Sequence, residues 1–282
     1  MFIQRTLSGA ILLAAAIFGM YMGGTVLACM LLAVAILSYR ELMKAIHDET
    51  KEKHAKLIMT VGFCFVVLFY LAFIAESCFK WSMGKTAALC TVILFVPANM
   101  LFYVLRFPEI KLKEILKSIF SFVYGPVMLG FIYLTRVSGY GKYLVWLILI
   151  CAWGCDTCAY CVGMLIGKKK IFPVLSPKKS LEGCIGGVVG TVIIGLLYGG
   201  FFLLKEYEIK NGFAVVAVIC VIGAVAGMLG DLGASAIKRE YGIKDYSKLI
   251  PGHGGVMDRF DSMIAIAPIV YVLSELLLKT RG

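Results

Sequence analysis

The sequence predicts an all-α, polytopic integral membrane protein with about nine transmembrane helices and no soluble domain. Of its 282 residues, 61% are hydrophobic, and the mean hydropathy is +0.91. A soluble domain has about 45–50% apolar residues, so one water-exposed fold cannot bury this much apolar surface. The bilayer must therefore act as the solvent for most of the chain.

Nine apolar stretches approach or reach the roughly 17–25 residues that cross a bilayer as a helix. They lie at about 8–22, 24–39, 57–75, 86–105, 118–135, 143–166, 184–204, 212–236 and 262–278. The run 8–39 is too long for one untilted helix, and Gly23 and Gly24 favour a turn within it. The apolar start with Arg5 is also compatible with a cleaved signal peptide, but it lacks a convincing small-residue cleavage site. We therefore interpret it as the first span.

The basic residues alternate between the two sides of this topology. The formal net charge is +11, and 20 of the 28 Lys and Arg residues fall in the N-terminus and the even-numbered loops. These are loop two (40–56), loop four (106–117), loop six (167–183) and loop eight (237–261). The positive-inside rule places them in the cytoplasm and the C-terminus outside, as expected for a plasma-membrane protein. The positive charge thus indicates topology and predicts no nucleic-acid partner.

We interpret residues 1–282 as a single membrane domain with two parts of different character. Residues 1–140 form a hydrophobic helical half with almost no ionisable residue at membrane depth, so no site is expected there. Residues 141–282 form the motif-bearing catalytic half. Its glycines recur four residues apart, a spacing that lets membrane helices pack closely. These pairs are Gly183/Gly187, Gly186/Gly190, Gly195/Gly199 and Gly223/Gly227.

The ten cysteines fall mostly inside apolar spans, where they are expected to act as small packing residues. Four of them, Cys151, Cys155, Cys158 and Cys161, form one helical stripe with two overlapping C-x-x-C patterns. A zinc or redox site is the alternative, but no nearby histidine supports it.

Carboxylates in the second half carry the clearest chemical signal, because a charge at membrane depth is expensive and usually functional. Asp156 lies within a span, and Asp231 lies near the end of the eighth. Asp258 and Asp261 begin the ninth span, three residues apart and so on one face. We predict that Asp231 and Asp258 bind Mg²⁺, with Asp245 as a further ligand and Asp261 nearby. Helix capping is the alternative for Asp258 and Asp261.

Basic and glycine-rich segments in loops six and eight predict phosphate binding. Glycines let a backbone approach a phosphate closely, and a following helix start offers free N–H groups. His253 is interpreted as a loop-fixing residue or, alternatively, a general base. The expected phosphate-binding residues are Lys178, Lys179, Lys238, Arg239, Lys244, His253, Gly254, Gly255 and Arg259. Basic loops together with convergent acids suit phosphoryl-type transfer at a membrane surface. The expected catalytic residues are Asp231, Asp258, Asp261, Lys238 and Arg239.

The segment from Ser235 to Asp261 resembles the signature of the phosphatidate cytidylyltransferases, the CDP-diglyceride synthases. The positions that fill the pattern are Ser235, Lys238, Arg239, Lys244, Asp245, Pro251, His253, Gly254, Gly255, Asp258, Arg259 and Asp261. Upstream, the segments 156–163 and 176–183 are also similar to the family; Ser180 stands where threonine is commoner. The resemblance covers about 150–262, roughly two fifths of the chain.

The resemblance implies CTP and phosphatidate as substrates, CDP-diacylglycerol and pyrophosphate as products, and a divalent cation such as Mg²⁺. It also implies an all-helical fold and a homodimer. A CTP-dependent polyprenol or phytol kinase, which would transfer the γ-phosphoryl group, is the alternative enzyme. A membrane transporter is the alternative of another class, although it does not explain two lysine-rich loops on the same side as the acids.

Overall fold

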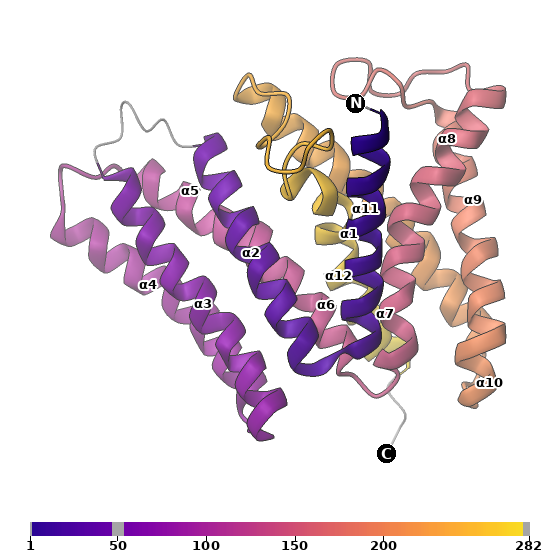
Figure 1. Cartoon of the computed structure of the whole chain (residues 1–282), viewed down its shortest axis with the longest axis horizontal. Coiled ribbons are helices and arrows are strands. Elements are labelled where there is room, and N and C mark those ends of the chain that lie inside the picture. The colour runs from indigo at the N-terminus through magenta and orange to yellow at the C-terminus, as the bar shows by residue number, and fades with distance from the viewer. Residues whose placement is uncertain (1, 47–53, 279–282) are drawn as a thin grey trace. The chain divides into compact units, whose positions relative to one another are not determined.

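The computed structural model describes residues 2–46 and 54–278, with side chains from residue 8 onward (Figure 1). Within these residues the secondary structure is helical, with three π-helical turns inside longer helices and no strand. The helices are α1 (Phe2–Met22), α2 (Gly24–Ile46), α3 (Ala55–Phe79), α4 (Gly84–Leu105), α5 (Leu112–Phe122), α6 (Met128–Arg136), α7 (Gly141–Leu149), α8 (Cys155–Ile166), α9 (Leu181–Tyr198), α10 (Leu204–Glu206), α11 (Gly212–Glu240) and α12 (Met257–Leu277).

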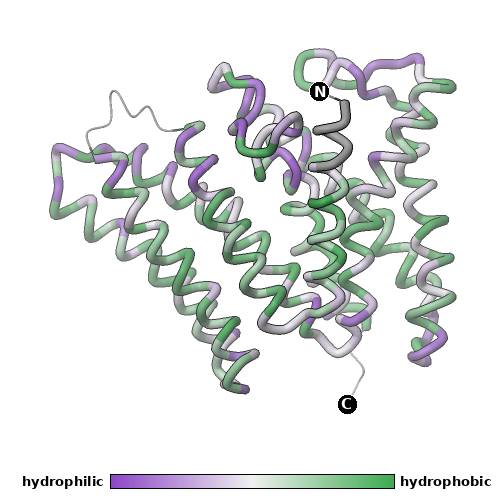
Figure 2. The backbone as a smooth tube through the Cα atoms, viewed as in Figure 1, coloured by the Kyte–Doolittle hydropathy of each residue, from purple (hydrophilic) through white to green (hydrophobic). Residues whose placement is uncertain are grey.

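Eight helical segments of the described residues are long and apolar enough to cross a membrane. They are Gly24–Ile46, Ala55–Phe79, Gly84–Leu105, Leu112–Arg136, Gly141–Ile166, Leu181–Glu206, Gly212–Glu240 and Met257–Leu277. A shorter apolar helix, Ser8–Met22, precedes them. Figure 2 shows hydrophobic residues along the helices and hydrophilic residues gathered in the connections. The chain is therefore a multi-pass membrane protein, as predicted.

Two glycines separate α1 from α2. Gly23 has φ 65° and Gly24 has φ 47°, in the left-handed region that glycine adopts most readily. The chain reverses at this point, which confirms the predicted division of the run 8–39.

Three of the long segments contain a π-helical turn: η1 (Val123–Val127), η2 (Ile150–Gly154) and η3 (Gly199–Leu203). Such turns widen a helix locally and often occur near functional sites. The turn η2 lies directly before α8, whose first turn contains Asp156.

The chain forms two compact units, which we describe separately. The first contains residues 1–133 and 241–259, and the second contains residues 134–240 and 260–282. The core of the first unit holds buried aromatic rings from α3, α4 and α5. The Phe95 and Phe122 ring centroids lie 4.2 Å apart, and those of Phe69 and Phe73 lie 4.9 Å apart.

In the second unit, glycines bring α8 and α9 into backbone contact. A Cβ atom at Gly183 would lie 2.9 Å from the Ala159 carbonyl oxygen, and one at Gly187 would lie 3.0 Å from that of Cys155. The predicted helix-packing role of these glycines is confirmed.

Three cysteines of the predicted stripe pack against glycines of neighbouring helices. Cys155 contacts Gly187, Cys158 contacts Gly190, and Cys151 contacts Gly223. All ten cysteines are free thiols, and no group of three potential metal ligands occurs among the described residues. The predicted packing role is therefore confirmed for these three residues.

Hydrogen bonds in the first unit join the segments that the charge pattern assigns to one side. Ser8, near the N-terminus, bonds His253 of loop eight at 2.8 Å. His54 of loop two bonds Glu109 of loop four, also at 2.8 Å. Ser247 of loop eight donates a hydrogen bond to Glu41 of loop two at 2.6 Å, so the N-terminal helix start and loops two, four and eight share one end of this unit.

The odd-numbered connections likewise meet one another. In the first unit, Thr25, directly after loop one, donates a hydrogen bond to Ser77, at the start of loop three, at 3.0 Å. In the second unit, the Tyr140 and Tyr207 rings of loops five and seven lie 4.8 Å apart. Five of the Lys and Arg residues used in the charge argument lie outside the described side chains: Arg5, Lys51, Lys53, Lys279 and Arg281. The cytoplasmic orientation of the basic end stays a prediction.

Candidate functional site

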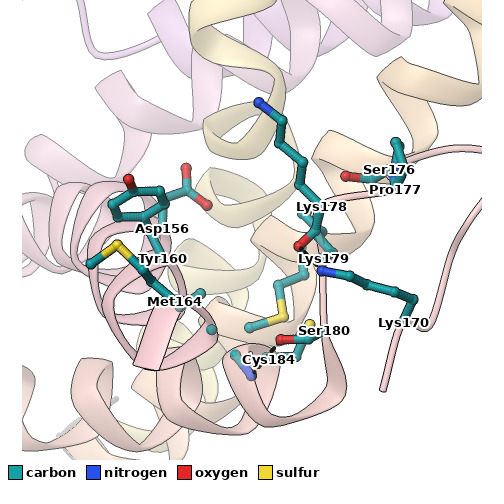
Figure 3. Close-up of a pocket in the computed structure, with 14 residues that line it drawn as sticks. Asp156, Tyr160, Met164, Lys170, Ser176, Pro177, Lys178, Lys179, Ser180 and Cys184 are labelled. Atoms are coloured by element: carbon teal, nitrogen blue, oxygen red, sulfur yellow. Dashed lines mark hydrogen bonds between the residues drawn. The ribbon is translucent and has the colours of Figure 1, made fainter. Parts of the chain in front are cut away.

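A cavity of about 500 Å³ opens in the second unit between α8, loop six and the start of α9. Figure 3 shows Asp156, Tyr160 and Met164 of α8 along one wall. The other wall comes from residues 176–180, with Lys170 beside them. Met228 of α11 also lines the cavity. The volume lies within the range of about 300–1,000 Å³ that small-molecule sites occupy.

The first turn of α9 holds loop six in place. The Ser180 hydroxyl caps this helix by accepting a hydrogen bond from the Gly183 N–H at 3.2 Å. The Glu182 carboxylate accepts hydrogen bonds from the backbone N–H groups of Lys168, at 3.0 Å, and Lys169, at 3.2 Å. Serine thus performs the capping that the commoner threonine would perform, and the loop backbone is anchored at both ends.

Loop six directs three lysines at the cavity. Lys170, Lys178 and Lys179 all line it, and the Lys170 ammonium donates to the Lys178 carbonyl at 3.1 Å. Lys178 and Lys179 were predicted to bind phosphate, and the structure places both at one cavity. Their phosphate contacts stay a prediction.

Lys179 forms an ion pair with Asp231 of α11. Both side chains are partly shielded, with 22% and 29% of their surfaces exposed. Met228 lies three residues before Asp231 on the same helix and lines the cavity. The predicted metal ligand Asp231 therefore lies beside the cavity wall, where it balances the charge of one lysine.

Asp156 is a cavity residue that the predicted site lacks. It lies in the first turn of α8 and faces the lysine-bearing wall in Figure 3. Two signals in the sequence pointed to it: an acid at membrane depth, and its place in the 156–163 segment. Asp156 therefore belongs to the candidate site.

In the first unit, the glycine-rich part of loop eight wraps around Asp258. This carboxylate is 7% exposed, and its Oδ2 atom accepts hydrogen bonds from the Tyr246 and Gly255 N–H groups, both at 2.9 Å. A Cβ atom at Gly254, where φ is +82°, would lie 2.9 Å from Asp258 Oδ2 and 3.3 Å from Asp245 Oδ1. Loop eight thus brings together Asp245 and Asp258, two of the three predicted metal ligands. The bonds of Asp258 go to loop residues that precede α12.

His253 is held by α1. Its Nδ1 atom lies 2.8 Å from the Ser8 hydroxyl, which also donates to the Pro251 carbonyl at 3.2 Å. This arrangement supports the loop-fixing interpretation of His253.

Glu41 of α2 is a second residue that the sequence reasoning missed. It is 5% exposed and accepts hydrogen bonds from the N–H groups of Val256, at 3.0 Å, and Met257, at 2.7 Å. The Ser247 hydroxyl donates a third, at 2.6 Å. Glu41 thus joins the half in which no site was expected to the loop that carries Asp258. No local pattern around Glu41 signals a partner more than 200 residues away.

The remaining predicted residues lie near the ends of α11 and α12 and in the connection between these helices. In the second unit, a Cβ atom at Gly230 would lie 2.6 Å from the Asp261 carbonyl oxygen. The backbones of α11 and α12 are therefore in contact at Gly230, the residue that precedes Asp231. Lys238 and Arg239 occupy the last turn of α11, and Lys244 and Arg259 are exposed. Asp231 and Asp258 belong to different units, and a metal site shared by them stays a prediction.

Comparison with known proteins assigns the chain to a family. A family model described as "Cytidylyltransferase family" matches residues 3–277, nearly the whole length. The chain belongs to the cytidylyltransferase family. Among curated relatives, the phosphatidate cytidylyltransferase of Staphylococcus haemolyticus (strain JCSC1435) is 28% identical over 269 residues, 95% of this chain and 97% of the relative. That of Bacillus subtilis (strain 168) is 30% identical over 247 residues, 87% and 90% of the two chains.

A third relative is similar over a shorter stretch. The phosphatidate cytidylyltransferase of Staphylococcus aureus (strain COL) is 37% identical over 153 residues, 54% of this chain and 56% of the relative. Membership of the cytidylyltransferase family thus rests on matches that span both compact units.

Proposed function

We propose that this protein transfers a cytidylyl group from CTP to phosphatidate and releases CDP-diacylglycerol and pyrophosphate. The observation that carries the proposal is the lysine-lined cavity within a chain that matches the cytidylyltransferase family along nearly its whole length. The named relatives support the choice of phosphatidate as the acceptor.

The cavity suits an anionic headgroup whose tails remain in lipid. Lys170, Lys178 and Lys179 supply positive charge, which binds and aligns phosphates. On the opposite wall, Tyr160 and Met164 are 70% and 66% exposed on a helix long and apolar enough to cross a membrane. An acyl chain can follow this exposed surface, while the phosphate reaches the lysines.

In the proposed reaction, a phosphate oxygen of phosphatidate attacks the α-phosphorus of CTP. The bond from that phosphorus to the oxygen bridging the α- and β-phosphates breaks, and pyrophosphate leaves with that oxygen. The acceptor is already an anion, so the step needs charge neutralisation and alignment rather than a general base. Lys178 and Lys179 are the proposed neutralising residues, and Lys238, Arg239, Lys244 and Arg259 are proposed to assist them.

The proposal includes Mg²⁺, with Asp258, Asp245 and Asp231 as its protein ligands. The residues fit this ion, because Asp245 and Asp258 converge at Gly254 and Mg²⁺ commonly takes one or two carboxylates plus substrate phosphates. Substrate and water oxygens would complete the coordination, since no cluster of three potential ligands occurs among the described residues. When bound, the ion neutralises charge on the departing pyrophosphate.

The decisive experiment supplies purified protein with phosphatidate, Mg²⁺ and CTP labelled at either the α- or the γ-phosphate. We expect the α-label in lipid and the γ-label in pyrophosphate. In a parallel reaction with a polyprenol or phytol in place of phosphatidate, the γ-label in lipid, with CDP as the other product, would instead identify a kinase. Failure of both labels to enter lipid, together with ion flux in proteoliposomes, would favour a transporter.

We further propose that the active end faces the cytoplasm of a bacterial cell and that the chain is a homodimer. The charge pattern supports the first proposal and the family resemblance supports the second. Light scattering of the detergent-solubilised protein, corrected for detergent mass, tests the dimer; a protein mass of one chain would reject it.

A further inference from the structure

Glu41 lies at the end of α2, far in sequence from every residue of the signature segment. Its carboxylate is almost fully buried, and both oxygens are used. Oε1 accepts from the Val256 N–H and the Ser247 hydroxyl, and Oε2 accepts from the Met257 N–H. All of these residues belong to the first unit. We infer that Glu41 is a positioning residue that holds the glycine-rich loop and the first turn of α12 in the geometry required for nucleotide transfer.

The hydrogen bonds to Glu41 join backbone N–H groups at a helix start to a charged acceptor. The first N–H groups of a helix lack partners within the helix, and the N-terminus carries a partial positive charge. A carboxylate placed there makes charge-assisted hydrogen bonds, roughly twice as strong as those between neutral groups. Here the carboxylate comes from another helix, so the same contacts hold residues 256 and 257, where α12 begins, against α2.

The glycine at position 255 of loop eight leaves the space that the Glu41 carboxylate occupies. A Cβ atom at Gly255 would lie 2.8 Å from Glu41 Oε1, so any larger residue would displace the carboxylate. The Gly255 N–H donates to Asp258 Oδ2 at 2.9 Å. Asp258 therefore holds the peptide group before the Gly255 Cα atom and Glu41 holds the one after it, so a movement of Glu41 would reach Asp258 through Gly255.

The inference rests on the proposed function, because the consequence to be measured is cytidylyl transfer. The first variant is Glu41→Gln, which keeps the size of the side chain but removes the charge and at least one acceptor. We expect turnover to fall about 10- to 100-fold, as for other small displacements of reacting groups. Ser247→Ala removes one of the three bonds and should produce a smaller loss in the same direction.

Glu114→Gln is the matched control. Glu114 is another buried carboxylate of the first unit, 4% exposed, and it caps its own helix by accepting from the Lys111 N–H at 3.3 Å. Its hydrogen bond stays at the start of α5, away from loop eight. We expect Glu114→Gln to lower thermal stability comparably while leaving turnover per folded molecule near that of the unaltered protein.

Two further measurements separate positioning from general destabilisation. Hydrogen exchange of a peptide covering 246–258 should accelerate in Glu41→Gln and not in Glu114→Gln. The Mg²⁺ concentration at half-maximal rate should rise in Glu41→Gln, whereas an unfolded fraction lowers only the maximal rate. In a double variant, Ser247→Ala should add little to Glu41→Gln, because both act on the same contact.

Normal turnover and unchanged exchange in Glu41→Gln would overturn the inference, as would a loss of activity equal to that of Glu114→Gln. If Glu41→Gln does not fold, unaltered turnover in Ser247→Ala with faster exchange of 246–258 would also overturn it. If the unaltered protein lacks cytidylyl transfer, the proposed function fails on its own, while the exchange data still report whether Glu41 holds the loop.

Discussion

At the scale of single residues, Lys179 and Asp231 set the charge of one cavity wall. We expect Lys179→Met to lower turnover about 100-fold, because it removes a preorganised cation and leaves Asp231 without its ion-pair partner. Steady-state kinetics on folded protein would measure the loss. Lys168→Met is the control: Lys168 lies in the same loop but does not line the cavity. Equal effects of the two substitutions would mean that only the total charge of the loop matters.

Asp258 provides a second residue-scale prediction. Asp258→Asn can keep an oxygen at the position that accepts from Tyr246 and Gly255, but it loses the negative charge. We expect turnover to be abolished with little change in the thermal midpoint, whereas Asp258→Ala should also lower that midpoint because two buried N–H groups lose their partner. Turnover and thermal unfolding of the two variants are compared across a series of Mg²⁺ concentrations. Near-normal turnover of Asp258→Asn at saturating Mg²⁺ would eliminate this carboxylate as an essential ligand.

Residue type and spacing alone identified part of the candidate site. Lys178 and Lys179 were predictable because a proline, two lysines and a helix start lie together in sequence. Asp156 could have been included on the same grounds as Asp231, since both are acids at membrane depth. Glu41 could not have been included from the sequence, because it lies next to basic and polar residues in a loop-like segment. Only folding brings it to Met257.

At the scale of helices, the pairing of α8 with α9 depends on glycine. A methyl group at Gly183 would meet the Ala159 carbonyl oxygen at 2.9 Å and the Gly163 Cα atom at 3.2 Å. Backbone atoms cannot swing aside, so we expect Gly183→Ala to destabilise the protein by about 1–3 kcal/mol. Thermal unfolding in detergent would show the loss. Gly139→Ala is the control, because nothing lies within 4 Å of the added methyl group. A comparable midpoint for both variants would contradict close packing at Gly183.

Hydropathy predicted the approximate number and bounds of the helices, but it did not predict the π-helical turns inside them. The predicted break at Gly23 and Gly24 is present because both residues adopt positive φ. By contrast, the π-helical turns η1, η2 and η3 leave no clear trace in an apolar sequence, because they depend on how neighbouring helices fill space.

At the scale of the whole molecule, the alternation of charge predicts which segments meet the cytoplasm. We expect Lys248→Cys, in loop eight, to react with an impermeant thiol reagent only after the cells are permeabilised. Trp81→Cys, in the loop between α3 and α4, should react in intact cells. Both positions are exposed, and the unaltered chain with its native cysteines provides the labelling baseline. The reverse pattern would invert the orientation.

Hydropathy and charge patterning determined that this chain spans a membrane through many helices, because these properties are local and sum along the sequence. The spacing of acids, lysines and glycines similarly determined the kind of chemistry and the family. Tertiary structure alone decided which groups became partners: Lys179 with Asp231, His253 with Ser8, and Glu41 with Met257. These contacts join residues 52 to 245 positions apart. A hydrogen bond or ion pair depends on distances that only the packed helices set, and the sequence around either partner does not encode them.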